Sequence, residues 1–252
     1  MADARPGPDD TSIERRIRMD LAACYRLIAL YGWDDLIYTH VSAHVPGPEP
    51  AFLINPIGLM FDEIRASDLV KVDLQGRVLD ASSKSINAAG FVIHSAVHAA
   101  RSDAGCVVHL HTPAGVAVSA LAAGLMPLNQ SAIGVATDMA YHEFEGPALD
   151  LEERERLVAD LGSRNAMILR NHGTLTLGPS VPEAFHRMYF LERACEIQTL
   201  TLGMGQALHQ PAAQAIEATQ EVTRSISRSM VHDHAWPALL RRLDRVSPGY
   251  RD

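Results

Sequence analysis

Apolar residues recur at helical spacing in several stretches of the chain. Thr11-Ser-Ile-Glu14 has the pattern of a capping box, apolar positions then recur every three or four residues, and Gly32 supplies a stop. The same spacing predicts helices over residues 87–100, 113–125, 151–161 and 182–202. After a joint at 203–211, the remainder of the chain is helical in pattern. It carries an apolar stripe that needs a surface to cover, made of Trp236, Leu239, Leu240 and Leu243.

Shorter runs of apolar and β-branched residues lie between these helices and predict strands. They are Phe52–Asn55, Leu69–Leu74, Arg77–Leu79, Cys106–His109, Ala166–Leu169 and Thr174–Leu177. Helices and strands therefore alternate, which predicts an α/β fold with a sheet covered by helices. Taken alone, this alternation favours a parallel sheet.

Length and composition bear on the domains and on the class of partner. The 252 residues are 47% hydrophobic and 21% charged, as in an ordinary globular protein. We expect one domain over 11–205, a flexible tail over 1–10, and a helical extension over 206–252 that packs on the same or a neighbouring subunit. The net charge of −8 argues against nucleic acid or a membrane surface as a partner, because both require a basic face.

The cysteines and the N-terminal residues favour a cytoplasmic location. Cys24, Cys106 and Cys195 lie far apart in apolar surroundings and without CxxC spacing, as expected of reduced, packed thiols. Residues 1–10 lack the pattern of an export signal, and no apolar run reaches the length needed to span a membrane.

Two histidines stand two residues apart at the end of a predicted strand. Side chains i and i+2 of a strand point to the same face, so His109 and His111 emerge together where Thr112-Pro113 turns the chain. A third imidazole, His172, follows another apolar strand and precedes Gly173, which lets the backbone turn sharply. Each histidine alone is also explained as a hydrogen-bonded surface or turn group. Together, three imidazoles with one open position form a catalytic metal arrangement.

The segments around these histidines are similar to a known family. Five of them resemble, in order, the class II aldolase/adducin family: Phe52–Leu59, Ala66–Asp73, Ala89–His94, Cys106–Thr112 and Ile168–Gly173. The resemblance runs from about Arg16 to Leu202. It is greatest to the adducin-like branch, in which Asn55-Pro56, Gly115–Ser119 and Val181–Phe185 also recur.

The resemblance implies a three-layer α/β fold whose central sheet is mostly antiparallel and flanked by helices. It also implies a homotetramer with active sites between subunits. In the metal-dependent aldolases and epimerases of the family, the histidines that match His109, His111 and His172 hold one divalent metal ion. Zinc is the expected ion, with manganese, cobalt and iron as alternatives. Such an ion would act as a Lewis acid on a small-molecule substrate, which makes carbon–carbon cleavage feasible without a Schiff base.

The sequence departs from these catalytic relatives at three places. Gly90 stands where the aldolases carry a carboxylate that works as acid and base. Ala88 and Ala89 replace two serines that help to bind a substrate phosphate, and the phosphate loop near the first strand is altered to Tyr38–Ser42. A phosphate ester is therefore a less expected substrate.

Other residues are candidates for catalysis and for substrate binding. Tyr141 resembles a tyrosine that donates a proton in aldolase relatives, or it belongs to an ordinary loop. Asn55 and Gly58 form a corner that the aldolases use near substrate. His40 replaces an asparagine of the substrate loop, so it faces the pocket or is a buried, hydrogen-bonded histidine. Packing is favoured for His94 and His98, and a solvated turn for His232–His234.

Three functions stay open at this point. The histidine set favours a divalent-metal-dependent carbon–carbon lyase, of the aldolase or decarboxylase type, acting on a small, non-phosphorylated hydroxy-carbonyl compound. The same three ligands can hold iron(II) for non-haem oxygenase chemistry. The third function is that of a non-catalytic, adducin-like binding protein, which the missing carboxylate at Gly90 keeps open.

Overall fold

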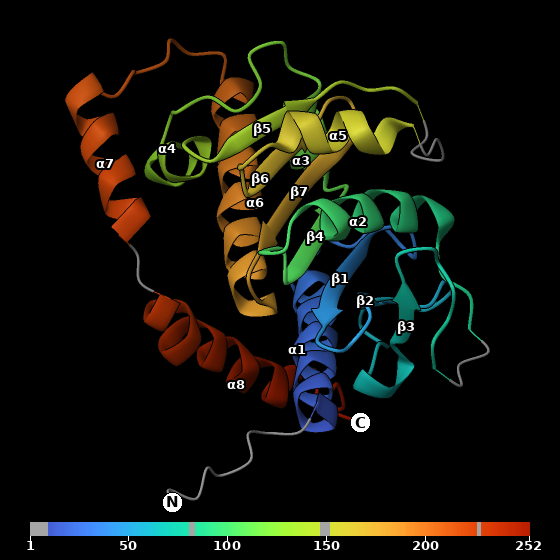
Figure 1. The fold of residues 1–252 in the computed structure, drawn as a ribbon. Coiled ribbons are helices and arrows are strands. Elements are labelled where there is room, and N and C mark those ends of the chain that lie inside the picture. The colour runs from blue at the N-terminus through green and yellow to red at the C-terminus, as the bar shows by residue number, and fades with distance from the viewer. Residues whose placement is uncertain (1–9, 81–83, 147–151, 226–227) are drawn as a thin grey trace, which may run out of the picture.

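The computed structural model describes residues 10–80, 84–146, 152–225 and 228–252. The tail predicted over 1–10 lies outside this part of the chain except for Asp10, where helix α1 (Asp10–Leu30) begins. The described residues form one seven-stranded sheet with helices on both of its faces (Figure 1). Among them, no helix is both long and apolar enough to cross a membrane.

The sheet is mixed but mostly antiparallel. Its strands are β1 (His40–Val45), β2 (Ala51–Ile54), β3 (Val70–Asp73), β4 (Cys106–Leu110), β5 (Met139–His142), β6 (Ala166–Leu169) and β7 (Gly173–Gly178). They lie in the order β3-β2-β1-β4-β7-β6-β5, and β5 and β6 are the parallel pair. The sheet implied by the family resemblance is confirmed. The parallel sheet that alternation alone favours is wrong, because short connections such as those between β1 and β2 and between β6 and β7 reverse the chain.

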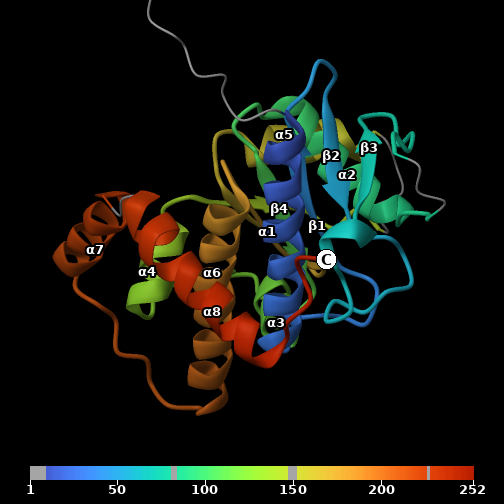
Figure 2. The same ribbon diagram turned by 90° about the horizontal axis from the view of Figure 1, so that it is seen from below.

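Helices pack on the two faces of this sheet in separate layers (Figures 1 and 2). On one face lie α1 and α6 (Val181–Gly203), which share a core with Val108 and Leu110 of β4. On the other face, α2 (Ala88–Ala100) and α5 (Glu153–Leu161) pack together, and Val107 of β4 belongs to the core beneath them. Since strand residues alternate between the two faces, His109 points toward the α2 and α5 layer.

The remaining helices pack around α1 and α6. Both α3 (Pro113–Ser119) and α4 (Gln130–Ala136) contact α6, and α7 (Ala213–Ser225) contacts α4. A short 3-10 helix (Ala66–Asp68) precedes β3, and a π-helical turn (Met230–Ala235) leads into α8 (Trp236–Val246), which lies against α1 (Figure 2). The indole N–H of Trp236 donates a 2.9 Å hydrogen bond to Asp20. The residues of the apolar stripe, Trp236, Leu239, Leu240 and Leu243, pack against the core that contains α1 and α6.

Several elements differ from those that the apolar pattern predicts. β1, α4 and β5 were not predicted, and the predicted strand Arg77–Leu79 forms a single bridge between Val72 and Val78. The helix expected to reach Leu125 ends at Ser119. β1 escaped the prediction because His40, Ser42 and His44 interrupt its apolar positions. The pattern of a half-polar strand resembles that of a loop when the strand is this short.

Candidate metal centre

The three histidines singled out from the sequence come together in the structure. The Nε2 atom of His111 lies 2.9 Å from Nε2 of His109 and 3.0 Å from Nε2 of His172. One nitrogen from each of the three rings lies within 4.8 Å of the others. Nitrogen ligands about 2.1 Å from one zinc ion lie about 3.4 Å apart in a tetrahedral site, so small side-chain shifts would give ligand spacing.

The ends of two neighbouring strands place these rings. In the antiparallel pair of β4 and β7, Leu110 lies opposite Thr174, so the end of β4 meets the beginning of β7. His172 belongs to the tight turn before β7, in which Asn171 adopts the left-handed region with φ of 54°. Asparagine adopts this conformation more readily than most residues. The turn thus brings His172 back over the end of β4.

Hydrogen bonds on the far side of two rings determine which nitrogen faces the cluster. Nδ1 of His109 lies 2.9 Å from the carbonyl oxygen of Thr174, and Nδ1 of His111 lies 3.2 Å from Oδ2 of Asp35. Both oxygens accept, so each Nδ1 carries the proton and each neutral ring directs a lone pair from Nε2 at the cluster. Two lone pairs 2.9 Å apart repel unless a cation lies between them. The donor set therefore fits a divalent metal ion.

Burial keeps His109 and His172 of this cluster in the neutral form that binds metal. Burial, followed by the neighbouring His172 and His111, holds the pKa of His109 well below its usual range. The pKa of His172 is lowered to about 4, mainly by burial and next by His111. His109 is 1% exposed, whereas His111 and His172 are half-buried. The cluster is thus closed beneath His109 and open on the side of the other two rings.

His40 lies next to this cluster, and it is also a buried, hydrogen-bonded histidine. Its ring centroid is 5.2 Å from that of His109, and its Nδ1 lies 2.9 Å from Nε2 of His94. His94 and His98 are buried in turn and contact Ser42. His40 thus matches the buried, hydrogen-bonded alternative, and its role in substrate binding stays a prediction.

The other residues predicted to bind substrate lie in different surroundings. The side-chain oxygen of Asn55 accepts a 2.8 Å hydrogen bond from the hydroxyl of Tyr25 on α1, so its amide is held by the scaffold. Gly58 lies at an exposed turn with φ of 98°. A role in substrate binding stays a prediction for both residues.

Tyr141 lies on the opposite face of the sheet from His109. On β5 its neighbour His142 reaches Asp160 of α5, at 2.7 Å, and the alternation of the strand turns Tyr141 toward the α6 side. Its hydroxyl accepts a 3.1 Å hydrogen bond from the backbone N–H of Leu125, and the guanidinium of Arg170 stacks on its ring. The proton-donating role stays a prediction for Tyr141.

Sequence reasoning missed Asp35, which orients His111. Asp35 belongs to the loop between α1 and β1, and its carboxylate is 76 residues away from His111 in the chain. No motif or spacing joins the two residues, so only the folded structure identifies the pair.

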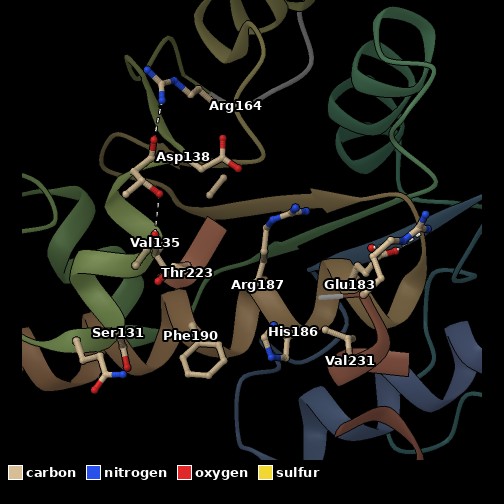
Figure 3. Close-up of a pocket in the computed structure, with 15 residues that line it drawn as sticks. Ser131, Val135, Asp138, Arg164, Glu183, His186, Arg187, Phe190, Thr223 and Val231 are labelled. Atoms are coloured by element: carbon tan, nitrogen blue, oxygen red, sulfur yellow. Dashed lines mark hydrogen bonds and ion pairs between the residues drawn. The ribbon is translucent and has the colours of Figure 1, made fainter. Parts of the chain in front are cut away.

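The structure also contains a cavity of about 790 Å³ (Figure 3). Side chains from α4 and α6 line it, among them Val135, His186, Arg187 and Phe190. None of the three clustered histidines lines this cavity. Its size alone does not make it the site of chemistry, because chemistry follows the convergence of functional groups.

Comparisons with known proteins agree with this fold. The model of the Class II Aldolase and Adducin N-terminal domain family matches residues 19–199. A protein of Caulobacter vibrioides whose name places it among class 2 aldolases is 54% identical over 95% of this chain and 93% of its own length. Mouse alpha-adducin is 48% identical over 75% of this chain, which matches 26% of the length of that adducin.

Solved structures support the same assignment. An aldolase II superfamily protein from Pseudomonas syringae superposes with a TM-score of 0.89 at 51% identity, over 95% of this chain and 96% of that one. An L-fuculose 1-phosphate aldolase from Glaciozyma antarctica shares the fold, with a TM-score of 0.84 at 24% identity over 99% and 97% of the two chains. The chain therefore belongs to the class II aldolase and adducin N-terminal domain family.

Proposed function

We propose that this protein is a divalent-metal-dependent carbon–carbon lyase. Its substrate would be a small, non-phosphorylated hydroxy-carbonyl compound, cleaved by an aldolase or decarboxylase reaction. The observation that carries this proposal is the convergence of Nε2 from His109, His111 and His172, with two of the rings oriented by Thr174 and Asp35. Zinc is the proposed ion, with manganese, cobalt or iron as alternatives.

The residues of the centre have separate tasks in this proposal. A divalent cation held there supplies a Lewis acid that stabilises negative charge on substrate oxygens. His109 is buried and anchors the ligand set through the Thr174 carbonyl. The rings of His111 and His172 are half-buried, which leaves a side open to a small molecule. Asp35 holds His111 in the ligating orientation.

A non-phosphorylated substrate is proposed because the groups expected to bind phosphate are altered. In the segment that replaces the usual phosphate-binding loop, Thr39 and Ser42 are fully buried. The hydroxyl of Ser42 is engaged with His94 and His98, so it is not available to a bound phosphate.

We also propose a homotetramer with sites between subunits, in a reducing cytoplasm. Large apolar side chains are exposed between α1 and β1, after β5, and on or next to α6 and α7. Exposed apolar residues of this kind support self-association. They are Leu36, Tyr38, Phe144, Leu200, Met204 and Val222. The three buried, unpaired thiols accord with a reducing compartment.

The lyase is tested by following substrate cleavage with proton NMR. The zinc-loaded protein is incubated with a panel of hydroxy-aldehydes, hydroxy-ketones and hydroxy-acids, each with its phosphate ester where one exists. We expect cleavage of at least one non-phosphorylated compound, and loss of that activity in the His109→Ala, His111→Ala double variant. Preference for the phosphate esters would contradict the proposed substrate class, and cleavage that survives in the double variant would contradict the metal centre.

A second candidate function is that of an adducin-like binding protein. It is favoured by the 48% identity with mouse alpha-adducin and by Gly90 in place of a catalytic carboxylate. A binding protein should retain its partner when His109 is replaced by alanine, because it needs the fold and not the metal. A lyase should lose its activity and its metal in the same variant.

A further inference from the structure

A row of buried polar side chains runs from the metal centre into the layer between the sheet and α2. His40 Nδ1 lies 2.9 Å from His94 Nε2, and His94 Nδ1 lies 2.5 Å from the hydroxyl of Ser42. The same hydroxyl lies 2.7 Å from His98 Nε2, and His98 Nδ1 lies 3.0 Å from the carbonyl oxygen of Ala104. All four side chains are at most 9% exposed. We call this row, from His40 to Ala104, the histidine relay.

The carbonyl at its end fixes the direction of every hydrogen bond in the relay. A carbonyl oxygen only accepts, so His98 carries its proton on Nδ1, and burial lowers the pKa of His98 to about 3, which keeps the ring neutral. Its Nε2 must then accept from the hydroxyl of Ser42. Ser42 has a single proton to donate, so its oxygen accepts from Nδ1 of His94.

The same reasoning continues to the metal centre. Neutral His94 with its proton on Nδ1 has a lone pair on Nε2, so His40 must donate to it from Nδ1. Burial holds the pKa of His94 well below the usual range, which keeps this ring neutral. His40 is therefore left with its lone pair on Nε2. No hydrogen bond from the described residues reaches that atom.

Gly90 makes the room in which this ring lies. A Cβ atom at position 90 would lie 2.4 Å from Cδ2 and 2.8 Å from Nε2 of His40, closer than real Cβ contacts allow. Any side chain at position 90 would therefore compete with the His40 ring for one space beside His109. A carboxylate side chain at position 90 and the His40 ring in its present position thus exclude each other.

We propose that His40 Nε2 is the proton acceptor of the metal centre, and that His94, Ser42 and His98 act as positioning residues that hold its lone pair there. This inference rests on the proposed lyase function. In an aldol cleavage, the substrate O–H bond breaks as the Nε2–H bond forms on His40. The electron pair of the O–H bond forms the second carbon–oxygen bond of the new carbonyl as the C–C bond breaks. The electron pair of the C–C bond stays on the other fragment, which becomes an enediolate. His40 returns its proton to that fragment, which restores the neutral ring.

The relay orients His40 and does not conduct protons away from it. Its last member is a carbonyl oxygen, which has no proton to exchange. Disrupting Ser42 should thus change the tautomer of His40, although the two residues have no hydrogen bond to each other.

Solid-state nitrogen-15 NMR of histidine-labelled, zinc-loaded protein tests the relay without a substrate. Signals are assigned through single His→Asn variants. We expect the Nδ1–H tautomer for His40, His94 and His98, and loss of that single tautomer at His40 in Ser42→Ala. Ser95→Ala is the matched control, because Ser95 is a buried serine of α2 whose hydroxyl bonds to Phe91 and Val92 outside the relay. An Nε2–H tautomer at His40, or an unchanged pattern in Ser42→Ala, would overturn the inference.

Two further readouts separate proton acceptance from metal ligation and from the lyase function. The cobalt-loaded His40→Asn protein should keep the visible absorption spectrum of the wild type, and a spectrum altered as in His172→Ala would identify His40 as a ligand instead. Cleavage should fall about a hundredfold or more in His40→Asn with little change in KM. An unchanged cleavage rate in His40→Asn would overturn the proton-accepting role. An intact tautomer pattern in a protein that cleaves nothing would contradict the lyase and not the relay.

Discussion

Gly173 lies so close to the end of β4 that a Cβ atom there would be 2.3 Å from the carbonyl oxygen of Leu110. The same atom would lie 3.2 Å from Cδ2 of His111. A glycine at the start of β7, directly after His172, is therefore required by the close approach of two backbones. Because those backbones carry all three clustered histidines, the missing side chain at position 173 sets their spacing.

Replacing Gly173 by alanine should separate β4 from β7 and disturb the metal centre. We expect the free energy of unfolding to fall by about 1–3 kcal/mol, as for other backbone clashes, and zinc affinity to fall at least tenfold. Urea unfolding and a zinc-chelator competition measure the two effects. Gly203→Ala is the matched control, because a Cβ there meets nothing within 4 Å at the end of α6. Wild-type zinc affinity in Gly173→Ala would contradict this account.

From the hydrogen bond between Asp35 and His111, we predict that replacing Asp35 also lowers the affinity for metal. Asp35→Ala removes the acceptor of the His111 Nδ1 proton, and the ring is then free to rotate or to change tautomer. Zinc affinity should fall about 10-fold to 100-fold, as measured by competition with a chromogenic chelator. Asp34→Ala removes the neighbouring carboxylate of the same loop and should leave the affinity unchanged. Equal affinities in the two variants would show that Asp35 does not orient the ligand.

From a buried carboxyl group next to the histidine cluster, we predict that the free energy of unfolding depends on pH. Glu192 of α6 is fully buried, and it contacts the hydroxyls of Thr112 and of Thr174, the latter at 2.5 Å. Burial raises its pKa from 4.5 to about 7. The folded state thus retains this proton to higher pH than the unfolded state. Its stabilising effect is full below pH 4.5, and it is lost as the pH rises through about 7.

Glu192→Gln should remove this dependence, because glutamine fills the same space without a charge. The unfolding free energy of the wild type minus that of the variant should fall by roughly 2–3 kcal/mol between about pH 5 and pH 8. Urea unfolding at several pH values measures this difference. Glu217→Gln, in α7, is a control for a change of surface charge. A difference that stays constant across this range would contradict a protonated Glu192 at neutral pH.

The sequence predicted the parts of the structure that depend on local pattern. The apolar strands Cys106–Leu110, predicted to end at His109, and Ala166–Leu169, and the glycine after His172, follow from residue type and spacing alone. The antiparallel arrangement did not follow from the pattern, since alternating helices and strands are compatible with either direction. It followed from the family resemblance. The resemblance likewise strengthened the grouping of His109, His111 and His172 as one candidate site, since each histidine alone has an ordinary explanation.

The parts that escaped prediction depend on contacts between distant segments. Asp35 is not connected to His111 by any spacing, and Ser42 joins His94 to His98 only because β1 lies beside α2. β1 itself was missed because His40 and Ser42 face this layer, where they bond to buried histidines and not to water. A buried polar cluster has the sequence pattern of a solvated loop, and only burial distinguishes the two.

The metal content of the purified, untagged protein tests the central claim most directly. Elemental mass spectrometry is performed on the wild type and on the His109→Ala, His111→Ala double variant, before and after reconstitution with zinc, manganese, cobalt and iron(II). The account predicts about one divalent ion per wild-type chain and almost none in a folded double variant. A folded wild-type protein that holds none of the four ions after reconstitution would contradict the metal centre and leave a binding protein with the aldolase fold.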